Sequence, residues 1–303
     1  MPLKTTPRVF LTACFALLAS SLIAQPAPKA APAPASTPAS AAAAPAAPGA
    51  VVEPKYGEGP GIVNAPRRED RPISARVPTT AGWRTDWPER LEWDLADLRV
   101  YRDANAKLGA PKEGESRVVF IGDSITEGWQ RSFATLFPNK PYIGRGRGSQ
   151  TTQQMLLRLR ADVIDLKPKA VVLLAGTNDI AGNLGRSTDK MIQDNIISII
   201  DLASLNKIKV VLCTIMPTTR YSWQPSVTDG GARVVVINKW LKEYAATRPG
   251  EVFFVDVHTP MVGADGTSMN PEFSSDGTHP NAKGYAAISP LVQAKIDEAL
   301  AAK

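Results

Sequence analysis

Cysteine is scarce in this chain, with only two among 303 residues. Cys14 lies in the N-terminal segment that we interpret below as a secretion signal, so Cys213 would be left alone in the mature chain. Cys213 ends an apolar run, and we interpret it as a buried packing residue. The sequence therefore predicts no internal disulfide, and a core of this size does not need one.

Histidine is equally scarce, and the chain has only His258 and His279. His258 closely follows the apolar run 252–255, and we interpret it as a surface or structural residue. The carboxylates that could join it around a metal ion show no ligand-pair spacing; they are Asp123, Asp179 and Asp256. We therefore expect no metal site and no cofactor.

Strong charge of one sign and long hydrophobic runs are also missing. The formal net charge is +6, and without Lys4 and Arg8 there are 33 basic residues against 29 acidic ones. No run of basic residues carries interleaved aromatics, so the sequence predicts no nucleic-acid partner. Beyond residue 24 no apolar run is long enough to span a bilayer, which predicts a mature chain without an integral membrane segment.

Residues 1–24 have the pattern of a secretory signal peptide. Lys4 and Arg8 form a basic start, and an apolar stretch with a small-residue end follows. The sequence thus predicts cleavage near Ala24 and a secreted or periplasmic protein. A lipoprotein anchored at Cys14 is the alternative, because the residues before it resemble a lipobox. The hydrophobic run continues past Cys14, which favours the secreted form.

Three further segments follow the signal. Residues 25–50 are almost entirely alanine and proline, which predicts a disordered linker. Residues 51–114 are interpreted as a strap and a helix, and 115–303 as the main domain. The helix is predicted to start at Asp86 with a capping box. Its apolar face would carry Leu91, Leu95 and Leu98.

Short apolar strands alternate with amphipathic helices over the main domain. This alternation predicts an α/β fold with three α/β/α layers, flavodoxin-like, around a five-stranded parallel sheet. The expected strands are 118–121, 141–143, 170–175, 210–215 and 252–255. The expected helices are 151–166, one around 192–200, one around 234–244 and one from 281 onward, although 234–237 alone would also suit a strand.

Polar residues gather at the ends of these strands. Ser124 comes just after the first strand, and Asn178 comes just after the strand 170–175. The carboxyl ends of parallel strands share one edge of the sheet, where open α/β sheets carry their chemistry. Asp276 stands three residues before His279, so one tight turn could bring its carboxylate to the imidazole. A serine, a histidine and a carboxylate, with N–H donors for an oxyanion, are what acyl transfer requires.

Each of these residues also has an ordinary structural interpretation. Ser124 could cap a helix, Asn178 could cap a turn, and Asp276 and His279 could share a loop hydrogen bond. Their occurrence together and in order favours the catalytic interpretation. The serine is not in a G-x-S-x-G motif, because Ile125 and Thr126 follow it, and this argues against the α/β-hydrolase fold.

The combination resembles the SGNH hydrolases, the GDSL-type esterases and lipases, from about residue 117 to the C-terminus. The matching blocks are 122–124, 176–179 and the pair Asp276 and His279. Within that family the resemblance is to secreted bacterial acyl-hydrolases related to the platelet-activating-factor acetylhydrolase subunits. It implies a catalytic triad of Ser124, His279 and Asp276.

The resemblance also implies an oxyanion hole made by the N–H of Ser124, the N–H of Ser149 and the side-chain amide of Asn178. In the second family block Ser149 stands where the family has glycine, and Gly144 stands where it has asparagine. A serine keeps the N–H donor unless the backbone there needs a positive φ.

We expect an ester substrate, a small molecule or a glycan, with a short acyl group such as acetyl. Arg145 and Arg147 could favour an anionic or sugar-acid substrate, or they could be two solvated loop arginines. Tyr221 and Trp223 could stack on a sugar or form a wall of an acyl pocket. The alternatives are a lipase, thioesterase or lysophospholipase type of acyl hydrolase, a non-catalytic carbohydrate-binding domain, and a structural protein of the cell envelope.

Overall fold

Five parallel strands form one sheet in the order β2-β1-β3-β4-β5. The structure is a computed structural model that describes residues 94–302. The strands are β1 (Val118–Gly122), β2 (Tyr142–Gly146), β3 (Ala170–Leu174), β4 (Lys209–Cys213) and β5 (Val252–Val255). Every strand lies close to where the sequence predicts one. The predicted signal 1–24, the linker 25–50 and the strap up to residue 93 lie outside the described residues.

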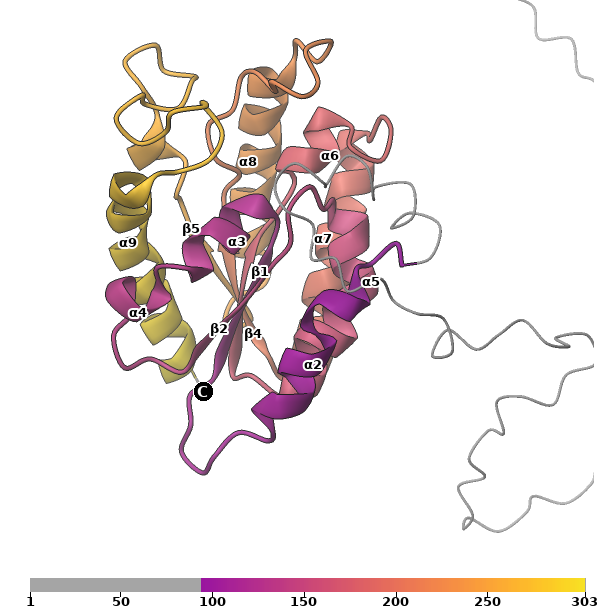
Figure 1. Cartoon of the computed structure of the whole chain (residues 1–303), viewed down its shortest axis with the longest axis vertical. Coiled ribbons are helices and arrows are strands. Elements are labelled where there is room, and N and C mark those ends of the chain that lie inside the picture. The colour runs from indigo at the N-terminus through magenta and orange to yellow at the C-terminus, as the bar shows by residue number, and fades with distance from the viewer. Residues whose placement is uncertain (1–93, 303) are drawn as a thin grey trace, which may run out of the picture. The chain divides into compact units, whose positions relative to one another are not determined.

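Helices cover both faces of the sheet (Figure 1). The α-helices are α2 (Leu98–Leu108), α3 (Ser124–Gln130), α4 (Phe133–Leu136), α5 (Thr152–Asp162), α6 (Thr177–Ala181), α7 (Asp189–Leu205), α8 (Gly230–Ala246) and α9 (Ala282–Ala301). Two 3-10 turns, 164–166 and 259–261, complete the regular elements of the described part of the chain. The three-layer prediction is confirmed, and residues 234–237 belong to a helix rather than a strand.

The alternation of side chains along each strand divides the core in two. Val119 and Ile121 of β1 pack with α5, α7 and α8, whereas Val118 and Phe120 pack with α3, α4 and α9. Successive residues of a strand point to opposite faces, so a run that is apolar throughout can bury both faces. This explains why each strand appears in the sequence as a short, continuous apolar run.

The predicted helix is interrupted before α2, while its predicted start at Asp86 and the predicted core residue Leu91 lie outside the described residues. Within the described residues, 94–97 form a turn in which Asp97 has φ 55°, and α2 begins at Leu98 instead of continuing a helix from further upstream. The carboxylate of Asp94 accepts the N–H groups of Leu98 and Arg99 and so caps the helix there. Leu95 and Leu98 are 40% and 37% exposed. Polar contacts, described below, hold α2 instead, and hydrophobic periodicity cannot detect them.

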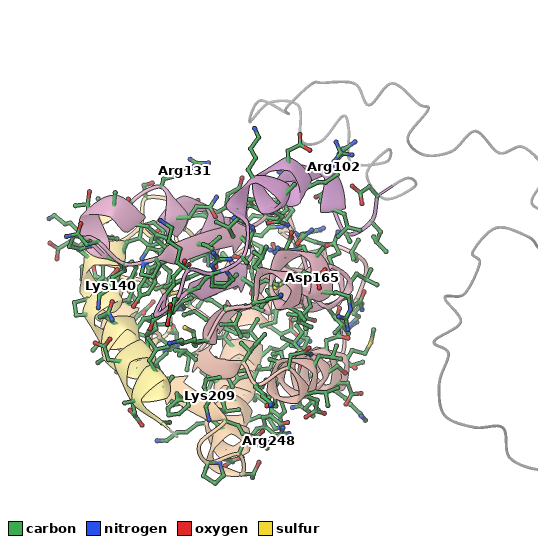
Figure 2. The ribbon with its side chains drawn as sticks, turned by 90° about the horizontal axis from the view of Figure 1, so that it is seen from below. Arg102, Arg131, Lys140, Asp165, Lys209 and Arg248 are labelled. Carbon is green, nitrogen blue, oxygen red and sulfur yellow. The ribbon has the colours of Figure 1, made fainter. Side chains whose placement is uncertain are left out.

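The surface charges are spread around the molecule. Arg102, Lys140 and Arg248 lie at separate places on the rim in the view of Figure 2. Arg248 pairs with Asp201 at 2.7 Å and with Glu251 at 2.8 Å, and such exposed pairs add little to stability. No helix of the described residues is both long enough and apolar enough to cross a membrane.

Candidate active site

The end of β1 is built so that a helix can begin at once. A Cβ on Gly122 would lie 2.6 Å from the carbonyl oxygen of Leu174 on the neighbouring strand, so only glycine fits there. Asp123 then caps α3 by accepting the N–H of Ile125 at 2.9 Å. Ser124 is the first residue of α3 and is only partly buried. Its hydroxyl is therefore held at the carboxyl edge of the sheet.

The three predicted triad residues meet at this edge. Ser124 Oγ lies 2.8 Å from His279 Nε2, and His279 Nδ1 lies 2.7 Å from Asp276 Oδ2. The other oxygen of Asp276 accepts the N–H groups of Thr278 and His279 at 2.9 and 2.8 Å. These two bonds fold the loop tightly enough for a carboxylate to reach an imidazole three residues later.

The electrostatics of the loop favour an ionised Asp276. Partial burial raises the pKa of Asp276, but the hydrogen bonds from the His279 N–H, the imidazole and the Thr278 N–H outweigh it and bring the pKa to about 2. The carboxylate therefore stays charged at neutral pH, where it can orient and stabilise an imidazolium. The side chains of His279 and Asp276 are 38% and 48% exposed, so solvent reaches the site.

The predicted oxyanion donors differ in how far they are already engaged. Among residues 94–302, the N–H groups of Ser124 and Ser149 donate to no protein acceptor. The N–H of Gly148, in contrast, donates to Glu127 at 2.7 Å. The Asn178 amide nitrogen donates to the Gln150 carbonyl at 3.0 Å and to Asp123 at 3.2 Å. The amide would have to share one of these hydrogens with an oxyanion.

Ser149 has a backbone that normally calls for glycine. Its φ is +66°, in the left-handed region. A serine is expected to keep the N–H donor of the family's glycine unless the backbone needs a positive φ, and at this residue φ is positive. The cost of this conformation for a residue with a Cβ is about 1–2 kcal/mol.

Ser149→Gly is expected to raise the free energy of unfolding by about 0.5–1 kcal/mol. The relief of the left-handed backbone is offset in part by the extra freedom of glycine in the unfolded chain, about 0.4–1 kcal/mol. Urea denaturation measures the difference. Ser116→Gly is the control, because Ser116 is not among the positive-φ residues, and this variant should lose stability. A Ser149→Gly protein less stable than the wild type would contradict the strain argument.

Two buried carboxylates lie behind the site. Burial raises the pKa of Asp123 to about 6, against the lowering effect of the Ile125 N–H. Burial likewise raises the pKa of Asp179 to about 6, although the N–H and hydroxyl of Thr152 donate to it at 2.9 and 2.6 Å. Asp179 thus joins α6 to the start of α5.

The raised pKa of Asp179 has a consequence for stability. The folded chain holds this proton up to about pH 6, while the unfolded chain releases it near its ordinary value of 3.8, so unfolding becomes easier as pH rises through this window. The difference between a pKa of 3.8 in the unfolded chain and about 6 in the folded chain lowers the free energy of unfolding by about 3 kcal/mol, at about 1.4 kcal/mol per pH unit. Asp179→Asn is expected to reduce this fall when urea unfolding is compared at pH 4 and pH 7. An unchanged slope would contradict a raised pKa at Asp179.

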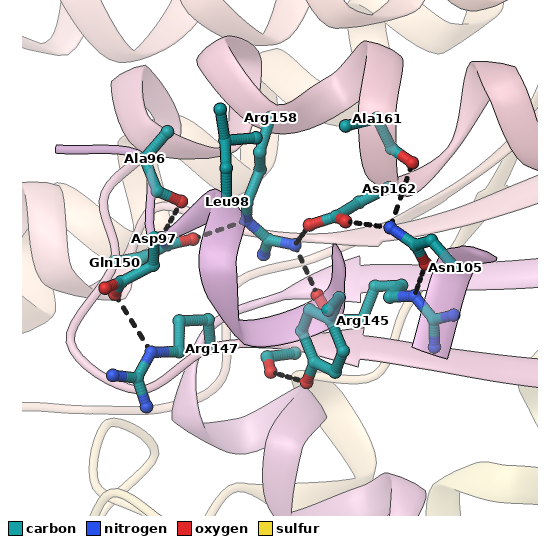
Figure 3. A network of polar contacts seen from close by, with 12 residues as sticks. Ala96, Asp97, Leu98, Asn105, Arg145, Arg147, Gln150, Arg158, Ala161 and Asp162 are labelled. Atoms are coloured by element: carbon teal, nitrogen blue, oxygen red, sulfur yellow. Dashed lines mark hydrogen bonds and ion pairs between the residues drawn. The ribbon is translucent and has the colours of Figure 1, made fainter. Parts of the chain in front are cut away.

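The two arginines predicted to meet substrate have partners within the protein. Arg145 is only 6% exposed; its guanidinium donates to Asn105 at 2.8 Å and lies 4.8 Å from the centre of the Tyr101 ring. Arg147 pairs with Asp97 at 2.9 Å. Both side chains belong to the contact with α2 (Figure 3), so neither is a freely solvated loop arginine, and a substrate role for them stays a prediction.

The two aromatic residues divide between the site and the core behind it. The ring of Trp223 is partly buried and lies 6.5 Å from the His279 ring, centre to centre. Tyr221 is 1% exposed and packs edge-on against Trp223 at 5.4 Å. The structure therefore brings Trp223 to the triad and places Tyr221 as its support. His258 lies near the end of β5, where its backbone N–H donates to Asp256, outside this group.

A buried arginine that the sequence analysis missed holds the loop between β2 and α5. Arg158 donates to the carbonyls of Gly122 and Arg145, to the side-chain oxygen of Gln150 and to Asp162. Gln150 in turn donates to the carbonyl of Ala96 next to α2 (Figure 3). A signal was present, because Arg158 and Asp162 are an i,i+4 pair on the same face as the buried Met155.

Arg158→Met is expected to lower the free energy of unfolding by about 3–5 kcal/mol, because it leaves the Asp162 carboxylate without its cationic partner in a buried place. Urea denaturation of the full chain measures this loss. Arg160→Met is the control on the same helix, since Arg160 is 67% exposed, and it should change stability by less than about 0.5 kcal/mol. Equal effects of the two variants would mean that the buried network contributes little.

Comparison with known proteins agrees with this geometry. The model of the GDSL-like lipase/acylhydrolase family matches residues 120–287. The chain therefore belongs to the GDSL-like lipase/acylhydrolase family, the SGNH hydrolases that the sequence blocks resemble. The matched range contains the nucleophile block, the asparagine block and the histidine loop.

Relatives come from several bacteria. A Bacteroides fragilis protein provisionally assigned as an acylhydrolase has a solved structure with 42% identity and a TM-score of 0.66, and the match covers 68% of this chain and 99% of that one. A GDSL-like lipase from Bacteroides thetaiotaomicron has 38% identity and a TM-score of 0.65, over 68% and 100% of the two chains. The uncharacterized lipoprotein YqeF of Bacillus subtilis is 27% identical over 217 residues, 58% of this chain and 87% of its own.

Proposed function

We propose that this chain is a serine ester hydrolase that works through an acyl-enzyme on Ser124. The observation that carries the proposal is the continuous chain of contacts from Ser124 Oγ through His279 to Asp276, at 2.8 and 2.7 Å. Such a chain lets an imidazole take the serine proton while the carboxylate stabilises the resulting charge. Membership of an acylhydrolase family supports the same chemistry.

The reaction begins when His279 Nε2 takes the proton of Ser124 and Oγ attacks the ester carbonyl. The N–H groups of Ser124 and Ser149 stabilise the oxyanion, and the Asn178 amide joins them by turning one hydrogen from its present acceptors. His279 then gives its proton to the leaving alcohol as the carbon–oxygen bond breaks. A water molecule loses a proton to His279 and attacks the acyl-enzyme, the carboxylic acid leaves, and Ser124 regains its proton.

The proposed substrate is a short-chain ester, such as an acetyl group on a carbohydrate or a similar alcohol. Trp223 supports this proposal, because its ring stands beside His279 and offers an apolar surface of limited size. The rates for p-nitrophenyl acetate, butyrate and octanoate test it. We expect the highest kcat/KM for acetate. A maximum at octanoate would favour a lipase type of activity, and no turnover of any ester would favour a non-catalytic binding domain.

We also propose that the protein works outside the cytoplasm, on the evidence of the signal-like residues 1–24. The relative YqeF is a lipoprotein, which supports an envelope location and keeps anchoring at Cys14 as the second candidate. Cell fractionation with mass spectrometry of the mature N-terminus distinguishes a chain cut near Ala24 from one that begins at a lipid-modified Cys14.

A further inference from the structure

Asn183 connects three parts of the site that lie far apart in the sequence. It follows α6, and its backbone N–H donates to the carbonyl of Asn178 at 3.0 Å. Its side-chain nitrogen donates to the carbonyl of Ser149 at 3.1 Å and to Asn178 Oδ1 at 2.8 Å. Its side-chain oxygen accepts the indole N–H of Trp223 at 2.8 Å. Both ends of the amide are therefore occupied by groups at the site.

The chemistry of these partners fixes which way each amide points. An indole nitrogen can only donate, so the end of Asn183 that faces Trp223 must be the oxygen. The nitrogen of Asn183 then faces Asn178 and must meet an acceptor there, which is Asn178 Oδ1. The nitrogen of Asn178 is consequently turned toward Asp123 and Gln150, where the oxyanion donor is needed.

We propose that Asn183 is a positioning residue that sets the orientation of the Asn178 amide. This inference rests on the proposed function, because the orientation matters only if Asn178 stabilises an oxyanion. Asn183 also holds the carbonyl of Ser149, whose N–H is a second donor. Without the Asn183 nitrogen, Asn178 Oδ1 loses its donor, and only the bonds of the Asn178 nitrogen to Gln150 and Asp123 then oppose a half-turn that presents the oxygen to the developing negative charge. That rotation replaces a stabilising donor with a repelling acceptor.

Asn183→Asp is the sharpest test, because it keeps the size of the side chain and the acceptor for Trp223 but removes both donors. The carboxylate would instead attract the Asn178 nitrogen and turn the amide over. We expect kcat for p-nitrophenyl acetate to fall by about 10²–10³, the usual effect of losing one oxyanion donor, with KM changed by less than about threefold. Asn206→Asp is the control: Asn206 is exposed and bonds only within the end of α7, so its kcat should stay at the wild-type value.

A double-mutant cycle separates positioning from a general structural effect. In the background of Asn178→Ala, Asn183→Asp should lower kcat by less than about threefold, because the group through which it acts is gone. A structural effect would lower kcat by the same factor in both backgrounds, and that result would overturn the inference. Urea denaturation establishes that each variant is folded under the assay conditions.

Trp223→Phe serves as a second variant should Asn183→Asp fail to fold. It keeps an aromatic ring at this place and removes the N–H that orients Asn183, together with part of the indole surface. Because the smaller ring can also change KM, the criterion is kcat: we expect it to fall by about threefold to tenfold in an otherwise wild-type chain, and by no more than about twofold when Asn178 is alanine. If Ser124→Ala abolishes turnover while both Asn183→Asp and Trp223→Phe keep the wild-type kcat, this inference fails alone. If Ser124→Ala leaves turnover intact, the proposed function itself has failed.

Discussion

Ser124→Ala is expected to lower kcat for p-nitrophenyl acetate by about 10⁴- to 10⁶-fold, the size of loss that follows removal of a nucleophilic serine from a triad. The reason is geometric. The hydroxyl stands 2.8 Å from His279 Nε2 at the first residue of α3, so alanine removes the group that attacks while leaving the helix intact. A p-nitrophenyl acetate assay measures the loss of kcat. Urea denaturation of the same variant checks that it is folded, and we expect its unfolding midpoint to equal that of the wild type within error.

Ser198→Ala is the matched control for this variant. Ser198 is in α7, and its hydroxyl bonds to the carbonyl of Asp194 within the same helix. Its removal should leave kcat and KM unchanged. A Ser124→Ala protein that keeps more than a tenth of the wild-type kcat would mean that another group performs the attack.

Asp276→Asn is expected to lower kcat by about 10⁴-fold while the loop keeps its shape. An asparagine oxygen can still accept the N–H groups of Thr278 and His279, which Asp276 Oδ1 now accepts. The amide nitrogen, however, would face His279 Nδ1, 2.7 Å away, and two donors cannot share that contact. The imidazole would have to offer the wrong nitrogen to Ser124, and its positive form would lose the neighbouring charge.

Asp265→Asn provides the matched control, since Asp265 accepts two backbone N–H groups in a similar turn, from Thr267 and Ser268. We expect this variant to keep the wild-type kcat. The low pKa of Asp276, about 2, adds a pH criterion: its carboxylate stays ionised down to about pH 3, so its protonation should not limit the reaction between pH 5 and 8. Equal rates for Asp276→Asn and the wild type would remove Asp276 from the mechanism.

The sequence predicted those features that depend on local pattern and chain order. The five strands are short runs buried on both faces, such as Ala170–Leu174, and their parallel order follows from the alternation with helices. Ser124 and His279 are 155 residues apart, and no periodicity relates them. Their meeting could be expected only because strand ends share one edge and because the blocks resemble a known family.

The side chains whose surroundings the sequence did not predict are held by polar contacts between distant segments. Arg145 and Arg147 are charged residues in a glycine-rich stretch, which is as typical of a binding loop as of a buried clamp. Only the three-dimensional structure shows that Asn105 and Asp97 reach them. Similarly, Asn183 belongs to no sequence motif. It lies five residues after Asn178, and its side chain is oriented by a hydrogen bond from Trp223, which is 40 residues further along the chain.

Sequence patterns also could not predict the strained backbone of Ser149. A serine gives no sign of a positive φ, and only the family's glycine at this place pointed to it. The structure has φ +66° there together with an N–H that donates to no protein acceptor. Strain of this kind is often found at functional sites, where the surrounding contacts hold it in place. Here the bond from Asn183 to the Ser149 carbonyl is one such contact.

The most direct test of the account is the site of covalent modification by an organophosphate. Diisopropyl fluorophosphate reacts with a serine that an imidazole activates, so the intact protein should gain one diisopropylphosphoryl group as esterase activity disappears. Peptide mapping by mass spectrometry should place that group on Ser124, and Ser124→Ala should take up none. Modification at another residue, or continued hydrolysis by a protein fully modified at Ser124, would contradict the assignment of Ser124 as the nucleophile.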